Sequence, residues 1–502
     1  MANRVLVVGW DGADWDVLDP LLGAGHLPAL AGLIERGQRG VSRSCLPSHS
    51  WAAWPTFLTG RDPGGHGVFD ILEHRPGATR RLPVSSKSIL ARTWPERLTE
   101  AGRSTLLVNV PLTYPPPELR GVAIAGGIVP PNRVYSHPAE AGPRLGWPIN
   151  GGSWTTYRNR PIELVEELEG LTRRRAAAMR SLLDDEAWDA ACIVFVSPDR
   201  AQHCLLEYVH PGHPAYERAA ATPVASRVRD LYRLLDAELA TLLERTDESD
   251  LVVLMSDHGH QPCTRALSMN KVLERLGFLR FGRGSAVVNL LSWGRVRSVA
   301  RVVYDKLGLH GRVAVPTAPI DWRETTAYTS VVSTGEGVSV NLAGREPEGT
   351  VARADYERVR EEVAEALLGF VDEETGGNPI GEVVKKEDAL SGPYLDRAPD
   401  LLLRPAPLYS LTHARQLVEQ ADWLSGDHRP EGIYVAAGPG VEKGTGPDIS
   451  LADFAAQIVE GVGLEADPEW GRSRAQAQPV GAYSDEEERL VEERLRGLGY
   501  LE

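Results

Sequence analysis

Short apolar runs, each ended by polar or turn-forming residues, recur along the chain and are typical of buried strands. These runs lie at 4–9, 190–196, 251–255 and 433–437. Segments with apolar residues at helical spacing lie between the first three runs, at 17–34, 162–183 and 215–244. A strand, a helix and a second strand in this order form a unit whose strands run parallel. The pattern therefore predicts an α/β fold.

The strand at 251–255 ends in a motif with possible metal-binding side chains, Ser256-Asp257-His258-Gly259. Asp257 and His258 would point to opposite faces of a straight strand, so both can reach one ion only if the chain turns here, which Gly259 permits. A carboxylate beside an imidazole suits zinc or manganese. A plain turn that caps the strand explains the same residues equally well, so the motif gains weight only from its neighbours.

Two further strand ends carry candidate ligands. Asp11 follows the first strand and is either a ligand or a turn residue, while Asp14 suits the cap of the next helix. Asp199 and His203 follow the second strand and share one face of a helical turn, a spacing that surface helices also show. Because parallel strands deliver their ends to one edge of a sheet, we expect these groups to meet.

The segment 42–67 is rich in hydroxyl side chains and turn formers. Its pattern predicts a short helix over 54–58, with Pro55 in the first turn. Hydroxyls just before that helix would lie near its positive end, where an anion is stabilised. Each serine in this segment could instead cap the helix.

His428 stands in a loop framed by Gly and Pro, just before the strand at 433–437. A single loop histidine is usually just exposed, so it carries weight only with the other groups. Two ion sites could form, one from Asp11, Asp257 and His258 and one from Asp199, His203 and His428. Two divalent cations about 4 Å apart hold the attacking and leaving oxygens in phosphoryl transfer, and a hydroxyl from the segment 42–59 could lie between them.

Composition limits the classes of function. With 502 residues, 42% of them hydrophobic, the chain can bury a large core as two or three domains or as one domain with insertions. The formal net charge of −15 argues against nucleic acid or an anionic membrane as a partner, because no net positive field attracts either. A phosphate-bearing substrate must then be drawn by local positive charge, such as metal ions. The sequence specifies no oligomeric state.

The N-terminal residues lead almost directly into the strand at 4–9 and show neither the apolar stretch nor the cleavage site of a signal peptide. No apolar run approaches the roughly 20 residues that span a bilayer. We therefore expect a cytoplasmic protein. The cysteines form no CxxC pair and are expected to be free thiols; they are Cys45, Cys192, Cys204 and Cys263.

Six segments, in order along the chain, resemble the alkaline phosphatase superfamily, in particular its branch of type I phosphodiesterase/nucleotide pyrophosphatase-like proteins and predicted phosphohydrolases or phosphomutases. They are Gly9-Trp10-Asp11-Gly12, Ser50 with Thr59-Gly60 and Pro63-x-x-His66-Gly67, Ser197 to His203, Ser256 to Gly259, Asn341 to Gly349, and His428 to Ile433. Each segment is modest, but their order is specific. The resemblance implies an alkaline-phosphatase-like α/β core, with a mostly parallel central sheet flanked by helices and with inserted cap or lid segments.

The resemblance also implies roles for single residues. In the family the nucleophile stands ten residues before the Gly of a Thr-Gly pair, which here is Ser50, whereas Ser48 and Thr56 are out of register. Cys45 lies fifteen residues before Gly60, which argues against the Cys-x-Pro-Ser motif of sulfatases. Ser50 would form a phosphoseryl intermediate beside two divalent ions, zinc or alternatively manganese. The resemblance places Asp11, Ser50, Asp257 and His258 at one metal, and Asp199, His203 and His428 at the other.

Insertions would divide the chain into core and cap. The expected catalytic core comprises 1–70, 186–260 and 395–465, the cap or substrate region 71–185 and 261–394, and a C-terminal surface-helix region 466–502. A basic stretch at 295–312 is expected to form a solvated or substrate-facing surface. A capped surface helix is expected from Ser484.

Two features depart from the family pattern. His260 stands where a bulky apolar residue is expected, and its role is open between a loop residue and a substrate contact. No residue is assigned to clamp the phosphate, although Arg200 and Arg429 adjoin proposed ligands.

The favoured function is metal-dependent hydrolysis of a small-molecule phosphoric monoester or diester. A phosphomutase with the same site and a non-catalytic metal-binding protein of this fold are the alternatives. A lid that excludes water would favour transfer over hydrolysis.

Overall fold

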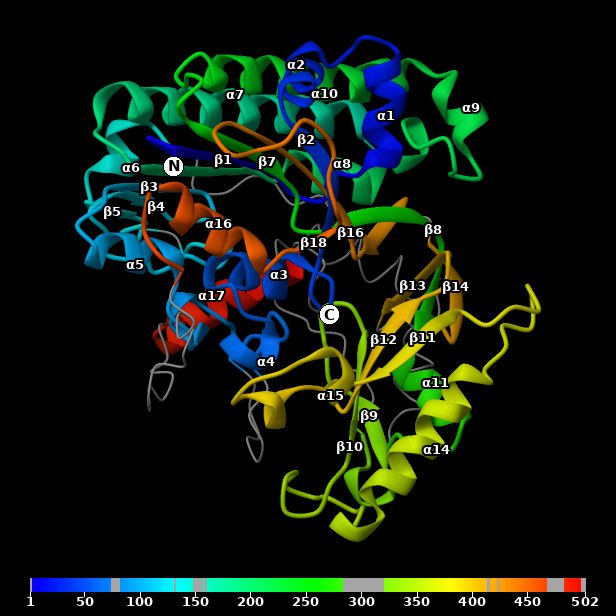
Figure 1. Ribbon diagram of the computed structural model, residues 1–502. Helices are drawn as coiled ribbons and strands as arrows, with labels where there is room; N and C mark the ends of the chain where they lie inside the picture. Colours follow the sequence, from blue (N-terminus) through cyan, green and yellow to red (C-terminus); the bar gives the residue numbers. More distant parts are fainter. Residues whose placement is uncertain are drawn as a thin grey trace, which may run out of the picture.

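A ten-stranded sheet forms the centre of the main body of the protein (Figure 1). The computed structural model describes residues 2–73, 82–130, 132–147, 157, 160–282, 320–412, 416–421, 424–466 and 483–497. Its strands are β1 (Val5–Trp10), β2 (Gln38–Arg43), β3 (Thr105–Val108), β4 (Gly121–Ile124), β5 (Ser136–His137), β6 (Ala190–Phe195), β7 (Leu251–Met255), β16 (Glu431–Ala437), β17 (Gly444–Thr445) and β18 (Ile449–Ser450). The order is β17-β2-β16-β7-β1-β6-β3-β4-β5, with β18 beside β2. Strands β7, β1, β6, β3 and β4 run parallel, so the mostly parallel sheet is confirmed.

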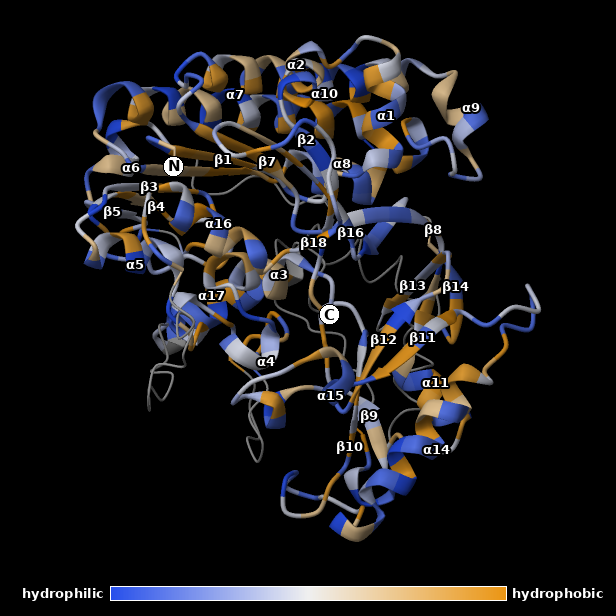
Figure 2. Cartoon of the chain, in the orientation of Figure 1, coloured by the Kyte–Doolittle hydropathy of each residue, from blue (hydrophilic) through white to orange (hydrophobic). Residues whose placement is uncertain are grey.

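Helices cover both faces of this sheet (Figure 1). One face carries α1 (Trp15–Gly23), α2 (Pro28–Arg36), α7 (Pro161–Asp185) and α10 (Pro223–Leu243), and the other α3 (Ser50–Thr59), α5 (Trp94–Glu100), α16 (Asp453–Gly461) and α17 (Asp485–Gly497). Strand β1 serves both layers, because alternate side chains of a strand point to opposite faces. Leu6 and Val8 pack in the first core, Val5 and Val7 in the second. Figure 2 shows hydrophobic strands between helices whose surfaces are mixed.

Two of the predicted helices are broken. The segment 17–34 forms α1 and α2, because Gly25 adopts a φ of 73° and Pro28 begins a new helix. The segment 215–244 likewise forms α9 (Tyr216–Ala220) and α10, which again begins at a proline. Proline is well placed in the first turn of a helix but disrupts a helix interior, so it marks the break.

The first helix begins as the sequence predicts. Asp14 accepts a hydrogen bond from the backbone N–H of Asp16 at 2.7 Å and so caps α1. No single helix among the described residues is long and apolar enough to cross a membrane, and α1 with α2 meets that test only as a pair bent by 101°. The four cysteines are free thiols in the structure.

Residues 71–185 differ from the predicted cap. They contribute β3, β4 and β5 to the main sheet and α7 to one of its helical layers, together with the short helix α6 (Ala141–Arg144). The C-terminal helix α17 is capped at Ser484, which accepts from the N–H of Glu487 at 3.4 Å, as predicted. It is more than a surface helix, because Val491 and Leu495 are buried in the core.

A second lobe lies beside the main body (Figure 1). Its strands are β8 (Gly259–Ser268), β9 (Ala327–Thr329), β10 (Gly337–Val340), β11 (Ile380–Lys385), β12 (Leu401–Pro405), β13 (Leu408–Thr412), β14 (Val418–Gln420) and β15 (Gly426–Arg429), and its helices α11 (Met269–Arg275), α14 (Tyr356–Leu368) and α15 (Lys386–Ala389). Strand β8 pairs with β13, β14 and β15, and β12 pairs with β10 and β11. The basic stretch 295–312 lies outside the described residues.

The buried carboxylate of Asp70 connects the second lobe to the main body. Asp70 accepts hydrogen bonds from the backbone N–H of Val332 at 2.5 Å and of Ser333 at 3.2 Å. The Ser333 hydroxyl donates to the same carboxylate at 2.5 Å. Three donors on one carboxylate hold the loop that joins β9 to β10 against the main body.

Arg345, part of the 341–349 motif, has a structural role in this lobe. Its guanidinium donates two hydrogen bonds to the buried Asp400 carboxylate, at 2.7 and 2.6 Å. Lys386 and the Tyr356 hydroxyl donate to the same group at 3.0 and 2.6 Å. Burial acts to raise the pKa of Asp400, but the hydrogen bonds from Arg345 outweigh it and lower the pKa to about 2.

Replacing Asp400 with Asn should therefore destabilise the fold by about 3 kcal/mol or more at neutral pH, because Arg345 and Lys386 would stay buried without their carboxylate. The difference from wild type should shrink as the pH falls from about 4 toward 2, since this stabilisation is complete above the unfolded pKa and is lost through the folded one. Urea unfolding at several pH values measures it. Removing the half-exposed partner of Lys385, by Glu361→Gln, should cost much less stability, because water and salt screen an exposed ion pair. Equal losses in the two variants would contradict the buried network.

Candidate metal centre

Three neighbouring strands end at one edge of the main sheet and deliver the acidic residues there. Asp11 follows β1, Asp257 follows β7, and Asp199 lies on α8 (Ser197–Leu205), which follows β6. In the sheet these strands stand in the order β7-β1-β6. The carboxyl ends of adjacent parallel strands form the usual site edge of an open α/β sheet, so the expected meeting of these carboxylates is observed.

His428 reaches the same place from a strand and not from the predicted loop. It lies on β15, which pairs antiparallel with β8, and its partner in the register is His260. Strand β8 begins at Gly259, directly after the Asp257-His258 pair. The motif at the end of β7 therefore turns straight into a strand that brings His428 back to the site.

Ser50 lies at the first residue of α3, at the positive end of the helix. The helix begins earlier than predicted, because the His49 carbonyl already accepts hydrogen bonds from two backbone N–H groups of the first turn. Pro55 consequently lies inside the helix and not in its first turn.

Ser50, Asp11, Asp257 and His258 form one cluster. The Ser50 Oγ lies 3.2 Å from Asp11 Oδ1 and 3.1 Å from His258 Nε2. His258 Nε2 is in turn 3.8 Å from Asp11 Oδ1 and 3.4 Å from Asp257 Oδ2. The Trp54 indole N–H donates to Asp11 Oδ2 at 3.0 Å and fixes that carboxylate.

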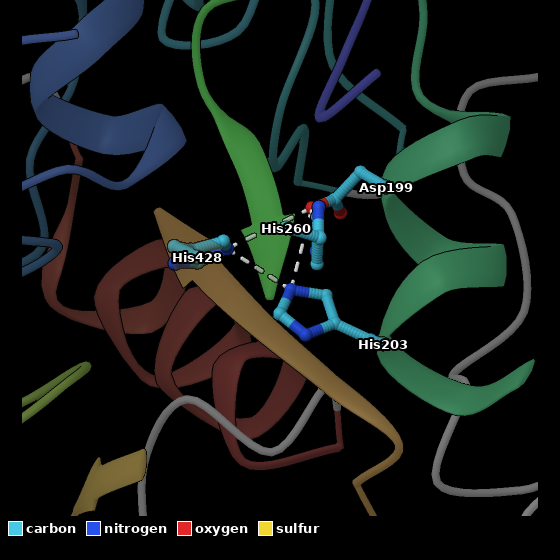
Figure 3. Close-up of side chains that lie close together, drawn as sticks. All are labelled: Asp199, His203, His260 and His428. Carbon is cyan, nitrogen blue, oxygen red and sulfur yellow. Dashed lines mark hydrogen bonds and ion pairs between the residues drawn. The ribbon is translucent and has the colours of Figure 1, made fainter. Parts of the chain in front are cut away.

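Asp199 and three imidazoles form a second cluster (Figure 3). Asp199 Oδ1 lies 3.3 Å from His203 Nε2, 3.6 Å from His260 Nε2 and 3.7 Å from His428 Nε2. The Nε2 atoms of His203 and His428 are 3.0 Å apart. The structure thus brings together all seven residues that the sequence singles out.

The two clusters are joined through Asp199. One ligand atom from each of Asp199, His203, His260 and His428 lies within 4.8 Å of the others, and the same holds for Asp11, Asp199 and His258. Asp257 lies outside both groups by this measure, although its carboxylate is close to His258.

The sequence left the role of His260 open, and the structure places it inside the second cluster. The residues next to His260 do not predict this position, because the histidine simply follows a turn glycine. The signal is the pairing of β8 with β15, which sets His260 opposite His428. Arg429, in contrast, is engaged elsewhere, since it pairs with Asp14 at 2.6 Å and Asp16 at 2.9 Å.

The carboxylates of the first cluster are poorly compensated. Burial, together with the nearby Asp199 carboxylate, raises the pKa of Asp257 to about 8. Burial, together with the charges of Asp257 and Asp199, holds the pKa of Asp11 well above its usual range. In the second cluster burial acts to lower the pKa of His203, yet Asp199 raises the pKa to about 9.

These residues fit a divalent cation. Across the described residues no lysine or arginine pairs with Asp11, Asp199 or Asp257, so the buried negative charge lacks a fixed positive partner. His260 Nε2 is fully buried and has no hydrogen-bond partner. Carboxylate oxygens and imidazole nitrogens are the donor types that zinc accepts.

Comparisons with known proteins point to one family and one fold. A family model described as Type I phosphodiesterase / nucleotide pyrophosphatase matches residues 5–431, a range that includes every proposed ligand. No curated protein sequence matches significantly.

Solved structures share the fold. A phosphonoacetate hydrolase from Sinorhizobium meliloti 1021, in complex with phosphonoacetate, is similar with a TM-score of 0.58 and 16% identity, over 92% of this chain and 96% of that one. Human ectonucleotide pyrophosphatase / phosphodiesterase 5 is similar with a TM-score of 0.52 and 14% identity, over 93% and 96%. An inactive variant of the murine protein, in complex with AMP, gives a TM-score of 0.53 and 14% identity over the same shares.

Metal-free protein should take up about two divalent ions per chain when zinc or manganese is added back. Bound metal should raise the thermal midpoint, since a free ion concentration one hundred times Kd stabilises a fold by about 2.7 kcal/mol. Elemental analysis and calorimetry measure both effects.

The variant Asp257→Asn should lose about one of these ions, because it removes one carboxylate from the first cluster. Asp236→Asn is the matched control, since this buried carboxylate caps α2 through the N–H groups of Ala29 and Leu30. Undiminished metal content in Asp257→Asn would remove Asp257 from the ligand set.

Proposed function

The chain belongs to the type I phosphodiesterase / nucleotide pyrophosphatase family and is a phosphoric ester hydrolase, and on this premise we propose that it acts through a phosphoseryl intermediate on Ser50. The observation that carries the proposal is the position of the Ser50 Oγ, between Asp11 Oδ1 at 3.2 Å and His258 Nε2 at 3.1 Å. A hydroxyl held in that way has its lone pairs and its proton directed by fixed groups.

The proposed ligand set follows the two clusters. Asp11, Ser50, Asp257 and His258 would hold one divalent ion, and Asp199, His203 and His428 the other, with zinc or manganese as the metal. Two such cations, when bound, would lower the pKa of the serine hydroxyl and neutralise charge that develops on the phosphoryl oxygens.

The chain's own residues direct two displacements at phosphorus. The Ser50 hydroxyl gives up its proton and its oxygen forms a bond to phosphorus while the bond from phosphorus to the ester oxygen breaks, so that the leaving oxygen takes up one proton in exchange. Water then attacks the phosphoserine, which releases phosphate and restores the Ser50 hydroxyl. The positive end of α3 attracts the phosphoryl group toward Ser50.

Small phosphorus-containing substrates fit this site best. The solved relatives in complex with ligands hold phosphonoacetate and AMP, both small anions. The chain's net charge of −15 opposes a polyanion such as nucleic acid, whereas cations buried at the sheet edge would draw a single phosphate group.

Ser50→Ala should lower the turnover of an aryl phosphate ester by at least about a thousandfold, because it removes the proposed nucleophile of the covalent step. Metal content should stay close to that of wild type, since most proposed ligands remain. Rapid-quench assays with aryl phosphates measure the loss, and elemental analysis measures the metal. Ser48→Ala removes a neighbouring buried hydroxyl and should keep activity. Full activity in Ser50→Ala would place the nucleophile elsewhere.

Metal-reconstituted protein tested against phosphate monoesters, phosphate diesters, phosphonates and sulfate esters should cleave at least one phosphorus-containing class and leave sulfate esters intact. Hydrolysis in ¹⁸O-labelled water should place one label in released phosphate, because water attacks the phosphoserine. Return of the phosphoryl group to the bound substrate without label uptake would show a mutase and overturn the hydrolytic second step.

A further inference from the structure

The second cluster contains one more histidine than the proposed ligand set needs. We infer that His260 is a fourth protein ligand of that metal site, beside Asp199, His203 and His428. The inference rests on the proposed metal centre and adds a residue that the resemblance does not assign.

Strand register places the His260 ring at the site. His260 and His428 are direct partners in the antiparallel pair of β8 and β15, and such partners project from the same face of a sheet. The ring centroids of His260 and His428 are 5.4 Å apart, and those of His260 and His203 are 4.7 Å apart. The rings of His260 and His428 therefore lie in the same space, with one ligand atom of each within 4.8 Å of the other (Figure 3).

Hydrogen bonding fixes which nitrogen of His260 is free to bind. Its Nδ1 lies 3.1 Å from the carbonyl oxygen of Gly12, and a carbonyl only accepts, so Nδ1 must carry the proton. The opposite nitrogen, Nε2, then presents a lone pair. It faces Asp199 Oδ1 at 3.6 Å, has no donor to satisfy it and is fully buried. A backbone carbonyl that orients a histidine in this way is the usual support of a metal ligand.

The surroundings hold the ring in place from two sides. A Cβ on Gly12 would lie 2.6 Å from Cε1 of His260, so only a glycine leaves room for the ring there. Gly12 itself has a φ of 68°, which favours glycine. On the other side the His260 backbone N–H donates to Asp14 Oδ2 at 3.0 Å, and Arg429 holds that carboxylate.

A fourth protein ligand changes which metal can serve the reaction. Zinc sites closed by four protein ligands are tetrahedral and leave no open position, whereas manganese prefers about six ligands. With Asp199 and three imidazoles bound, zinc would be closed to a substrate oxygen, while manganese would keep open positions. The second site should therefore work with manganese and be bound tightly but unproductively by zinc.

The test compares wild type with His260→Leu, which replaces the imidazole by an apolar side chain of similar reach. Chelator competition should show that the affinity of one of the two manganese sites falls about tenfold or more, while the other is unchanged. The visible spectrum of the cobalt-loaded protein should change, because it reports the number and type of ligands. The ratio of turnover with zinc to turnover with manganese should rise in the variant.

His210→Leu is the matched control, a buried histidine that contacts Asp16 at 3.6 Å and no proposed ligand. It should keep both affinities and the cobalt spectrum. A crystal structure of the metal-loaded wild type needs no variant and should place an ion about 2.1 Å from His260 Nε2. An ion more than about 3 Å from that atom, or unchanged affinity and spectrum in His260→Leu, would overturn the inference.

The same measurements separate this inference from the proposed function. Wild type that binds two ions and keeps both affinities after His260→Leu would refute the fourth ligand and leave the metal centre standing. Wild type that binds no divalent ion, by calorimetry, would refute the metal centre and with it the fourth ligand.

Discussion

Three carboxylates buried at one edge of a sheet repel one another, and this repulsion is the constraint from which the rest of the site follows. Asp11 and Asp257 are almost fully buried, and their pKa values are raised because water no longer screens them. The free-energy cost of burying these carboxylates is set by the fold, because they follow the ends of β7, β1 and β6, and these strands pack in the core. Four imidazoles surround the acids, and imidazole nitrogens together with carboxylate oxygens are donor types that zinc accepts.

Much of this site could be predicted because it follows from a local rule. Each acidic residue stands directly after a buried apolar run, and parallel strands end on the same side of a sheet. Asp11, Asp199 and Asp257 therefore met where the sequence placed them. The sequence alone puts His428 in a loop and leaves the role of His260 open between a loop residue and a substrate contact. Their placement depends on the pairing of His260 with His428, 168 positions further along the chain, and no local pattern records that pairing.

The fold shows the same division. Strands β1, β6, β7 and β16 stand out in the sequence as apolar runs of five to seven residues. In contrast β3, β4 and β5 have four residues or fewer, and their region was interpreted as a cap although it extends the main sheet. The segments that resemble the family contain framework residues as well as candidate ligands. His66 is hydrogen-bonded to Thr56 at 3.0 Å, and Arg345 to Asp400, so His66 and Arg345 support the framework. A match to a family motif therefore does not tell a metal ligand from a residue that supports the framework, whereas the contacts in the structure do.

Strand β8 carries His260 near its beginning, where it pairs with β15. It continues to Ser268 and pairs there with β13 and β14 in the second lobe. Both strands of the β8–β15 pair that sets the two histidines side by side also join the main sheet, since β8 follows β7 and β15 leads into β16. The second lobe is therefore attached to the main sheet directly beside the two histidines. Because a shift of one residue in strand register turns a side chain to the opposite face of a sheet, the pairing of β8 with β15 constrains the metal centre as much as the ligands themselves do.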